Sequence, residues 1–288
     1  MNRLRLCLLV TLHVALACPV AAVAQQVVRL PMADGAAPSA ITATLFKPAS
    51  SREPAPAAAI FHGCGGIGVN VTRMAQRLAG QGFVALLVDS FGVRGVSNAC
   101  TRNWPTPAQA RDRTRDIDAA VAWLAAQTFV AADRIAVMGY SYGGGVVLMW
   151  SLQPPPDRRR PDSKGADARA VIAVYPDCAL LDGGAPPAAR QPTLMAMAER
   201  DDWTPVRQCE AMLARVAPGR ERIETRVYPG AHHSFDAVGV PVTWLAAAGN
   251  RSKPNGCCGA HYGYHAPAYA QFLQDVDAFV GRHLRGPR

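Results

Sequence analysis

The sequence predicts an α/β fold in which helices cover both faces of a mostly parallel sheet. Short apolar runs alternate along the chain with longer amphipathic stretches, which is the element order typical of such a sheet. The run at residues 83–88 is continuously apolar, as expected for a strand that is buried on both faces. The chain of 288 residues is 50% hydrophobic, so it can bury a sizeable core.

The expected strands are the short apolar runs. The first two, at residues 27–30 and 41–46, are expected to pair antiparallel. The run at 57–61 ends directly before His62 and Gly63. Further strands are expected at residues 83–88, 134–138, 170–175, 193–198 and 223–228. Because ligands of such sheets bind at the carboxyl ends of the strands, the reactive residues that follow each strand are the candidates for a site.

Helices are expected between these strands. The helix at residues 71–81 is stopped by Gly82. The stretch 107–127 is amphipathic, with Ile117 on its apolar side and Arg111 on the other. Further helices are expected at residues 206–216 and 269–284, and an apolar one begins at 146–150.

Residues 1–24 have the features of a signal peptide. Arg3 and Arg5 precede an apolar stretch that is too short to span a membrane, and Ala22-Val23-Ala24 offers a cleavage site before Gln25. We therefore expect an exported protein, periplasmic or secreted, whose mature part at 25–288 is one domain. Cys18 leaves a lipoprotein as an alternative, although its neighbours fit a lipidation signal poorly.

The net charge of +9 comes mainly from scattered arginines. The one run, Arg158-Arg159-Arg160, lies in a proline-rich stretch that is more typical of a solvated loop than of a nucleic-acid patch. After the signal peptide no apolar stretch is long enough to span a membrane. We therefore expect neither a nucleic-acid partner nor stable membrane insertion, and the oligomeric state stays open.

Six of the eight cysteines lie outside the expected signal peptide. An even number in an exported chain suggests disulfides, and 15 pairings of six cysteines are possible. Neighbouring strands favour Cys64–Cys100 and Cys178–Cys209, and a vicinal Cys257–Cys258 bond is a third hypothesis. Cys257 and Cys258 with His261 and His265 also have the ligand types of zinc. Oxidation is favoured over a metal, and no metal site is expected.

The stretch Gly139-Tyr140-Ser141-Tyr142-Gly143 matches the G-x-S-x-G pattern of a nucleophile elbow. A predicted strand precedes it and an apolar helix follows it, and the glycines would permit a sharp turn between them. The alternative is a turn that serves close packing alone. We interpret Ser141 as a nucleophile because the rest of the chain offers the partners that it needs.

A serine hydroxyl is a poor nucleophile until a base takes its proton and a carboxylate orients that base. Asp201 and Asp202 follow the strand at 193–198, and His232 and His233 follow the strand at 223–228. The order serine, aspartate, histidine is that of a nucleophile elbow enzyme. Spacing alone does not choose within either pair.

The motifs GYSYGGG, RDDWTP and GAHHSF, with HGCGG upstream, resemble the dienelactone hydrolase family over about residues 40 to 283. The resemblance implies an α/β-hydrolase fold that cleaves a carboxylic ester or lactone through an acyl-enzyme, without a cofactor. The aspartate of that family stands four residues before a proline, as Asp201 does before Pro205. Its histidine directly precedes a small residue and a phenylalanine, as His233 does. The resemblance therefore implies a triad of Ser141, Asp201 and His233.

The resemblance also implies an oxyanion hole and a substrate clamp. The backbone N–H groups of Tyr142 and of Cys64, with Gly65 as the alternative, are expected to bind the oxyanion. Founding members of the family use a cysteine nucleophile and hold a substrate carboxylate with two arginines. Here Arg94 is a plausible first arginine, or else an ordinary salt-bridge residue, and Ala237 stands in place of the second. Dienelactone itself is therefore in doubt as the substrate.

Two other functions remain as alternatives. The elbow also suits a secreted hydrolase of polyesters or lipid esters. An inactive binding protein with the same fold is possible, but the complete order of Ser141, Asp201 and His233 argues against it. The long segment 237–267 is expected to be a lid or a binding loop, and His62 is expected to be structural.

Overall fold

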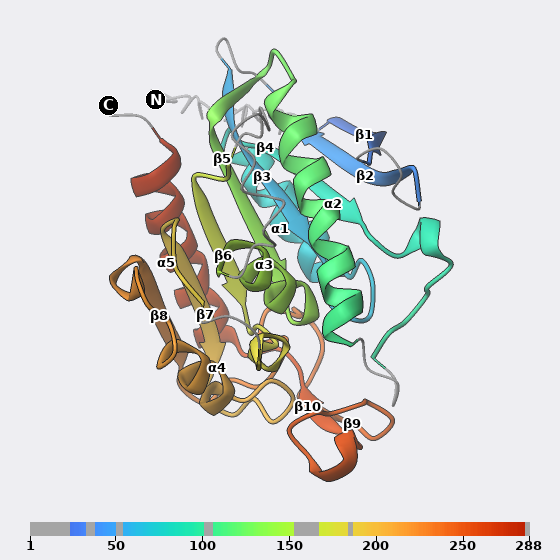
Figure 1. Ribbon diagram of the computed structural model, residues 1–288, viewed down its shortest axis with the longest axis vertical. Helices are drawn as coiled ribbons and strands as arrows, with labels where there is room; N and C mark the ends of the chain where they lie inside the picture. Colours follow the sequence, from blue (N-terminus) through green and yellow to red (C-terminus); the bar gives the residue numbers. More distant parts are fainter. Residues whose placement is uncertain are drawn as a thin grey trace, which may run out of the picture.

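An eight-stranded sheet forms the centre of the computed structural model, which describes residues 24–32, 38–49, 54–100, 106–152, 167–183 and 187–285. Its strand order is β1-β2-β4-β3-β5-β6-β7-β8 (Figure 1). The bounds are β1 Ala24–Pro31, β2 Ala40–Lys47, β3 Ala55–Phe61, β4 Val84–Asp89, β5 Val130–Tyr140, β6 Ala170–Val174, β7 Thr193–Ala198 and β8 Ile223–Tyr228. The expected signal peptide before residue 24 and the arginine run at 158–160 lie outside the described residues.

The sheet is parallel from β3 to β8, whereas β1 pairs antiparallel with β2 and β2 pairs antiparallel with β4. The antiparallel pairing of the two opening strands confirms the prediction. The order of strands reverses between β3 and β5, because the chain first adds β4 on one side of β3 and then β5 on the other. A reversal of this kind opens a crevice at the carboxyl ends of the two strands.

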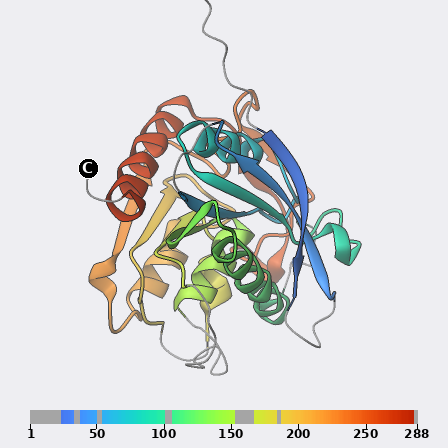
Figure 2. The same ribbon diagram turned by 90° about the horizontal axis from the view of Figure 1, so that it is seen from above.

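Helices cover both faces of the sheet, as Figure 2 shows. The helices α1 (Val69–Gly80) and α5 (Ala266–Leu284) pack on one face, and α2 (Pro107–Ala125), α3 (Tyr142–Leu152) and α4 (Val206–Leu213) pack on the other. Successive strand residues alternate between the two cores, since Val137 packs in one and Met138 in the other. This arrangement confirms the predicted fold class and explains the continuously apolar strands.

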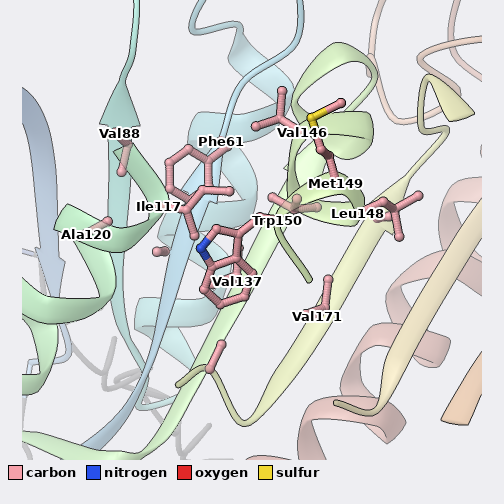
Figure 3. Close-up of a cluster of buried hydrophobic side chains, with 14 of the residues drawn as sticks. Phe61, Val88, Ile117, Ala120, Val137, Val146, Leu148, Met149, Trp150 and Val171 are labelled. Carbon is pink, nitrogen blue, oxygen red and sulfur yellow. The ribbon is translucent and has the colours of Figure 1, made fainter. Parts of the chain in front are cut away.

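The ends of the helices follow their local chemistry. Thr106 and Gln109 form a capping box at the start of α2, and Pro107 occupies its first turn. The imidazole of His265 accepts a hydrogen bond from Ala268 N, so α5 begins at Ala266, earlier than expected. Every residue of α3 is buried. Figure 3 shows its Trp150 beside Ile117 and Val137, in the core between α2, α3 and the sheet.

A two-stranded ribbon lies in the long segment between β8 and α5. Its strands, β9 (Thr243–Leu245) and β10 (Ala260–Tyr262), pair antiparallel at the lower edge of Figure 1. One contact of this segment with the rest of the chain is a hydrogen bond that Gly249 N donates to Cys100 O.

The described cysteines form the pairs Cys64–Cys100, Cys178–Cys209 and Cys257–Cys258. These are the three pairings hypothesised from the sequence. Among the described residues, no helix combines the length and apolar character that crossing a membrane requires.

Candidate active site

Ser141 occupies a sharp turn between β5 and α3. Its backbone has a φ of 55°, a left-handed conformation that is uncommon for residues other than glycine and is kept where the surroundings enforce it. Ser141 N donates to Val174 O at 2.9 Å, and Gly145 N donates to Ser141 O at 2.9 Å. The turn is therefore held from the neighbouring strand and from the first turn of the helix.

The glycines of this turn permit a close approach of three backbone segments. A Cβ atom on Gly139 would collide with the carbonyl of Gly143, and one on Gly143 would lie 2.7 Å from Phe61 O. A Cβ atom on Gly63 would lie 3.3 Å from Ser141 Cβ. The HGCGG turn after β3 therefore lies directly beside Ser141.

A continuous chain of hydrogen bonds joins the three residues of the expected triad. His233 Nε2 lies 2.9 Å from Ser141 Oγ, and His233 Nδ1 lies 2.8 Å from Asp201 Oδ2. All three residues are buried. Asp201 follows β7 and His233 follows β8, so the parallel sheet brings both to the edge where Ser141 lies.

The carboxylate of Asp201 is fixed by its own turn. Oδ1 accepts hydrogen bonds from Trp203 N at 2.9 Å and from Thr204 N at 2.8 Å. Thr204 Oγ1 lies 3.0 Å from Asp201 Oδ2 and 3.2 Å from His233 Nδ1. Backbone donors thus occupy one carboxylate oxygen, and the other oxygen faces the imidazole and the Thr204 hydroxyl. Sequence reasoning missed Thr204, although an aspartate that can bind the backbone two residues on is a recognisable turn signal.

The competing residues of each pair face elsewhere. Asp202 Oδ2 lies 2.9 Å from His261 Nδ1, and Asp202 Oδ1 accepts from His261 N at 2.8 Å. The ring of His232 also lies against His261, at 5.4 Å between centroids. Asp202 and His232 thus contact β10 of the ribbon.

His62 lies in the buried base of the HGCGG turn. Its Nδ1 lies 2.7 Å from Gly63 O, its Nε2 accepts from Ser90 N, and its carbonyl accepts from Arg113 Nη2. Burial, aided by the charge of Arg113, lowers the pKa of His62 to about 3. The imidazole is therefore neutral at ordinary pH, and its contacts fit the structural role that was expected.

The expected oxyanion residues flank Ser141. Tyr142 follows it in the chain, and its ring lies 4.9 Å from the guanidinium of Arg113. Cys64 is buried, accepts from Ala99 N at 2.8 Å and is joined to Cys100. The use of their N–H groups to bind an oxyanion stays a prediction.

Arg94 makes a bidentate ion pair with the buried Asp116, at 2.9 Å and 2.7 Å, and its Nη1 also donates to Ser90 O. This contact is the salt bridge that was the alternative to a substrate clamp. A role of Arg94 in substrate binding stays a prediction.

The residues that suggested zinc do not gather. Cys257 and Cys258 are joined to each other, His261 is held by Asp202, and His265 caps α5. Within the part of the chain that the structure describes, no group of three or more histidine, cysteine or acidic side chains is arranged to hold a metal ion.

Comparison with known proteins identifies the family of the chain. A model of the dienelactone hydrolase family matches residues 41–284. A probable 2-oxo-3-(5-oxofuran-2-ylidene)propanoate lactonase from Bradyrhizobium is 27% identical over 195 residues, which are 62% of this chain and 73% of the relative.

Solved structures share the fold at low sequence identity. A putative dienelactone hydrolase from Klebsiella pneumoniae is 16% identical, with a TM-score of 0.59 over 90% of this chain and 99% of its own. Esterase 2 from Thermogutta terrifontis is 18% identical, with a TM-score of 0.62 over 92% and 97%. The family match covers most of the chain, and the chain therefore belongs to the dienelactone hydrolase family of α/β hydrolases and is a carboxylic ester hydrolase.

Proposed function

We propose that the protein cleaves a carboxylic ester or lactone with Ser141 as nucleophile, His233 as base and Asp201 as the residue that orients the base. The observation that carries the proposal is the buried hydrogen-bond chain from Ser141 Oγ through the imidazole to Asp201 Oδ2, at 2.9 Å and 2.8 Å. Such a chain has the geometry that general-base activation of a hydroxyl requires.

The reaction proceeds in two halves. Ser141 Oγ attacks the ester carbonyl while its proton passes to His233 Nε2, and the N–H groups of Tyr142 and Cys64 bind the oxyanion. The C–O bond to the alcohol then breaks, and the alcohol leaves with the proton from His233. Water attacks the acyl-enzyme in the same way and releases the acid. These steps use only side chains, backbone N–H groups and water.

We infer that this chemistry takes place outside the reducing cytoplasm. Three disulfides among the described residues support export, as do the signal features of residues 1–24. The mature chain 25–288 would then be a single domain.

Organophosphorus labelling of Ser141 tests the proposal. Intact-mass measurement of the mature protein after treatment with a fluorophosphonate is expected to show one adduct, and Ser141→Ala is expected to show none and to lose hydrolysis of a short-chain aryl ester. The probe suits the fold, because Thermogutta terrifontis esterase 2 is described as phosphonylated by sarin. No adduct on folded wild-type protein, with ester hydrolysis equal to that of Ser141→Ala, would favour the inactive binding protein.

The distribution of exposed apolar side chains favours a bulky apolar ester as a second candidate substrate. Of the ten large apolar residues that are exposed in the described part of the chain, eight follow the carboxyl ends of β3, β4 and β8, the edge that carries Ser141. They are Ile67, Val69, Val93, Val96, Val238, Val242, Trp244 and Leu245. Exposed apolar side chains at the sheet edge that carries a site suit a binding surface. A lipid ester or a polyester chain fits this surface.

Trp244 is the side chain best placed to distinguish these substrates. Its ring packs at 4.8 Å on His261, which is bound to Asp202 beside the triad residue Asp201. Trp244→Ala is expected to lower kcat/KM about tenfold for long-chain aryl esters, because roughly 1–2 kcal/mol of apolar contact is lost, and less than about twofold for an acetyl ester. The control is Val227→Ala, which removes an equally exposed apolar side chain on β8. Equal losses on both esters would exclude a role in chain recognition.

A further inference from the structure

A second buried carboxylate lies close to His233. Asp236 follows His233 by three residues and is 2% exposed. Its Oδ1 accepts a hydrogen bond from Tyr175 Oη at 2.8 Å, and Asn70 Nδ2 lies 3.2 Å from its Oδ2. Among the described residues no arginine or lysine forms an ion pair with it. A buried carboxylate without a cation is costly, so its presence calls for a reason.

Tyr175 connects this carboxylate to the proposed triad. Its ring lies 4.6 Å from the imidazole of His233, at an interplanar angle of 59°. Tyr175 has a φ of 34°, a strained conformation for a tyrosine. Its carbonyl oxygen lies 3.1 Å from Thr204 Oγ1, the hydroxyl that also contacts Asp201. Side chain and backbone of Tyr175 thus both touch the surroundings of the imidazole.

The charges around Asp236 point to the same histidine. In the described part of the chain, Asp236 interacts with four titratable groups, those of Tyr140, Tyr175, Tyr269 and His233. Arg73 and Arg77 of α1 act on Tyr269. Of the four groups that interact with Asp236, only His233 gains a positive charge during the proposed reaction.

The hydrogen bonds suit an ionised Asp236. Burial raises the pKa of the Asp236 carboxyl, and the donors Tyr175 and Asn70 together with His233 oppose that rise. Burial, followed by the charge of Asp236, raises the pKa of Tyr175. Tyr175 therefore stays protonated and serves as a donor to the carboxylate.

We propose that Asp236 is a positioning residue that supports His233 from a second side: through Tyr175 it holds the imidazole, and its charge stabilises the imidazolium formed when Ser141 gives up its proton. The inference rests on the proposed roles of Ser141 and His233. Asp201 binds the imidazole directly, whereas Asp236 acts through a ring contact and through its field, which is weakly screened because the carboxylate is buried.

Asp236→Asn tests this role because it retains an oxygen that can accept from Tyr175 and removes the charge. The rates of Ser141 labelling by a fluorophosphonate and of aryl-ester hydrolysis are measured across the acid limb of the pH profile. Loss of the charge disfavours the protonated, inactive histidine, so the acid limb is expected to move to lower pH by about half a unit to one unit. The same loss destabilises the imidazolium in the transition state, so the plateau rate is expected to fall roughly threefold to tenfold.

Asp275→Asn is the matched control, because Asp275 likewise accepts from a tyrosine hydroxyl, that of Tyr228, at 3.0 Å. It is expected to leave the acid limb unmoved. Should Asp236→Asn fail to fold, Asn70→Ala removes a donor to Asp236 from a half-buried position. Loss of this hydrogen bond raises the pKa of Asp236 and leaves less of the carboxyl ionised at acid pH, so a smaller shift of the limb in the same direction is expected. A folded variant whose label appears on Ser141 with the wild-type acid limb overturns the inference and leaves the triad intact. Absence of the label from wild-type protein overturns the triad itself.

Discussion

Replacing Asp201 with asparagine is expected to lower kcat/KM for an aryl ester by about 10⁴-fold. Asp201 Oδ2 lies 2.8 Å from His233 Nδ1, and in the proposed mechanism this carboxylate holds the tautomer in which Nε2 accepts the serine proton. An amide in its place offers an N–H group that favours the wrong tautomer, and it carries no charge to stabilise the imidazolium. Steady-state kinetics on the purified variant, with circular dichroism to establish that it is folded, measures the effect.

The neighbouring aspartate provides the control. Asp202 is the next residue in the chain, and its carboxylate pairs with the half-exposed His261 instead of His233. Asp202→Asn therefore removes the same charge without touching the imidazole of His233. Its kcat/KM is expected to change less than about threefold, as for an exposed ion pair. A larger loss in Asp202→Asn than in Asp201→Asn would contradict the role proposed for Asp201 and would assign the orienting role to Asp202.

The central strands were predictable because helices cover both faces of the sheet, so apolar residues are required on both sides of each strand. A strand between two layers of helices is buried along its length, and the expected runs at 83–88 and 193–198 closely match β4 and β7. The end of α3 was not predictable, since all of its residues are buried and no amphipathic period marks where it stops. β9 and β10 have three residues each. They are held in part by contacts such as His261 to Asp202, which the sequence pattern does not show.

The arrangement of the candidate site was predictable where a turn imposes a local sequence pattern. The two glycines around Ser141 are required by the turn itself, so the pentapeptide reveals it. The choice of Asp201 over Asp202 came from family resemblance and stays a prediction; in the structure two backbone N–H groups bind Asp201 Oδ1, and Oδ2 faces His233. The link from Tyr175 to Asp236 spans 61 residues and has no motif. Only the folded chain brings these two residues together.

The elbow also makes the fold sensitive to a single methyl group. Gly143→Ala is expected to destabilise the protein by about 3 kcal/mol and to abolish most of its activity, because the added Cβ would meet the carbonyl oxygens of His62 and Phe61. Both are backbone atoms, so the collision is relieved only by moving Ser141 away from the HGCGG turn. Urea unfolding and aryl-ester kinetics of the variant measure the two effects.

Gly281→Ala is the matched control. Gly281 lies within α5, and a Cβ atom there would meet nothing within 4 Å. The substitution is expected to stabilise the protein by about 0.5–1 kcal/mol, since alanine loses less backbone entropy in a helix than glycine does, with activity unchanged. If Gly143→Ala retained wild-type stability and activity, the close contact between the elbow and β3 would not be what sets the position of Ser141. A loss confined to Gly143→Ala would show that the glycine pattern recognised in the sequence is a steric requirement of the nucleophile turn.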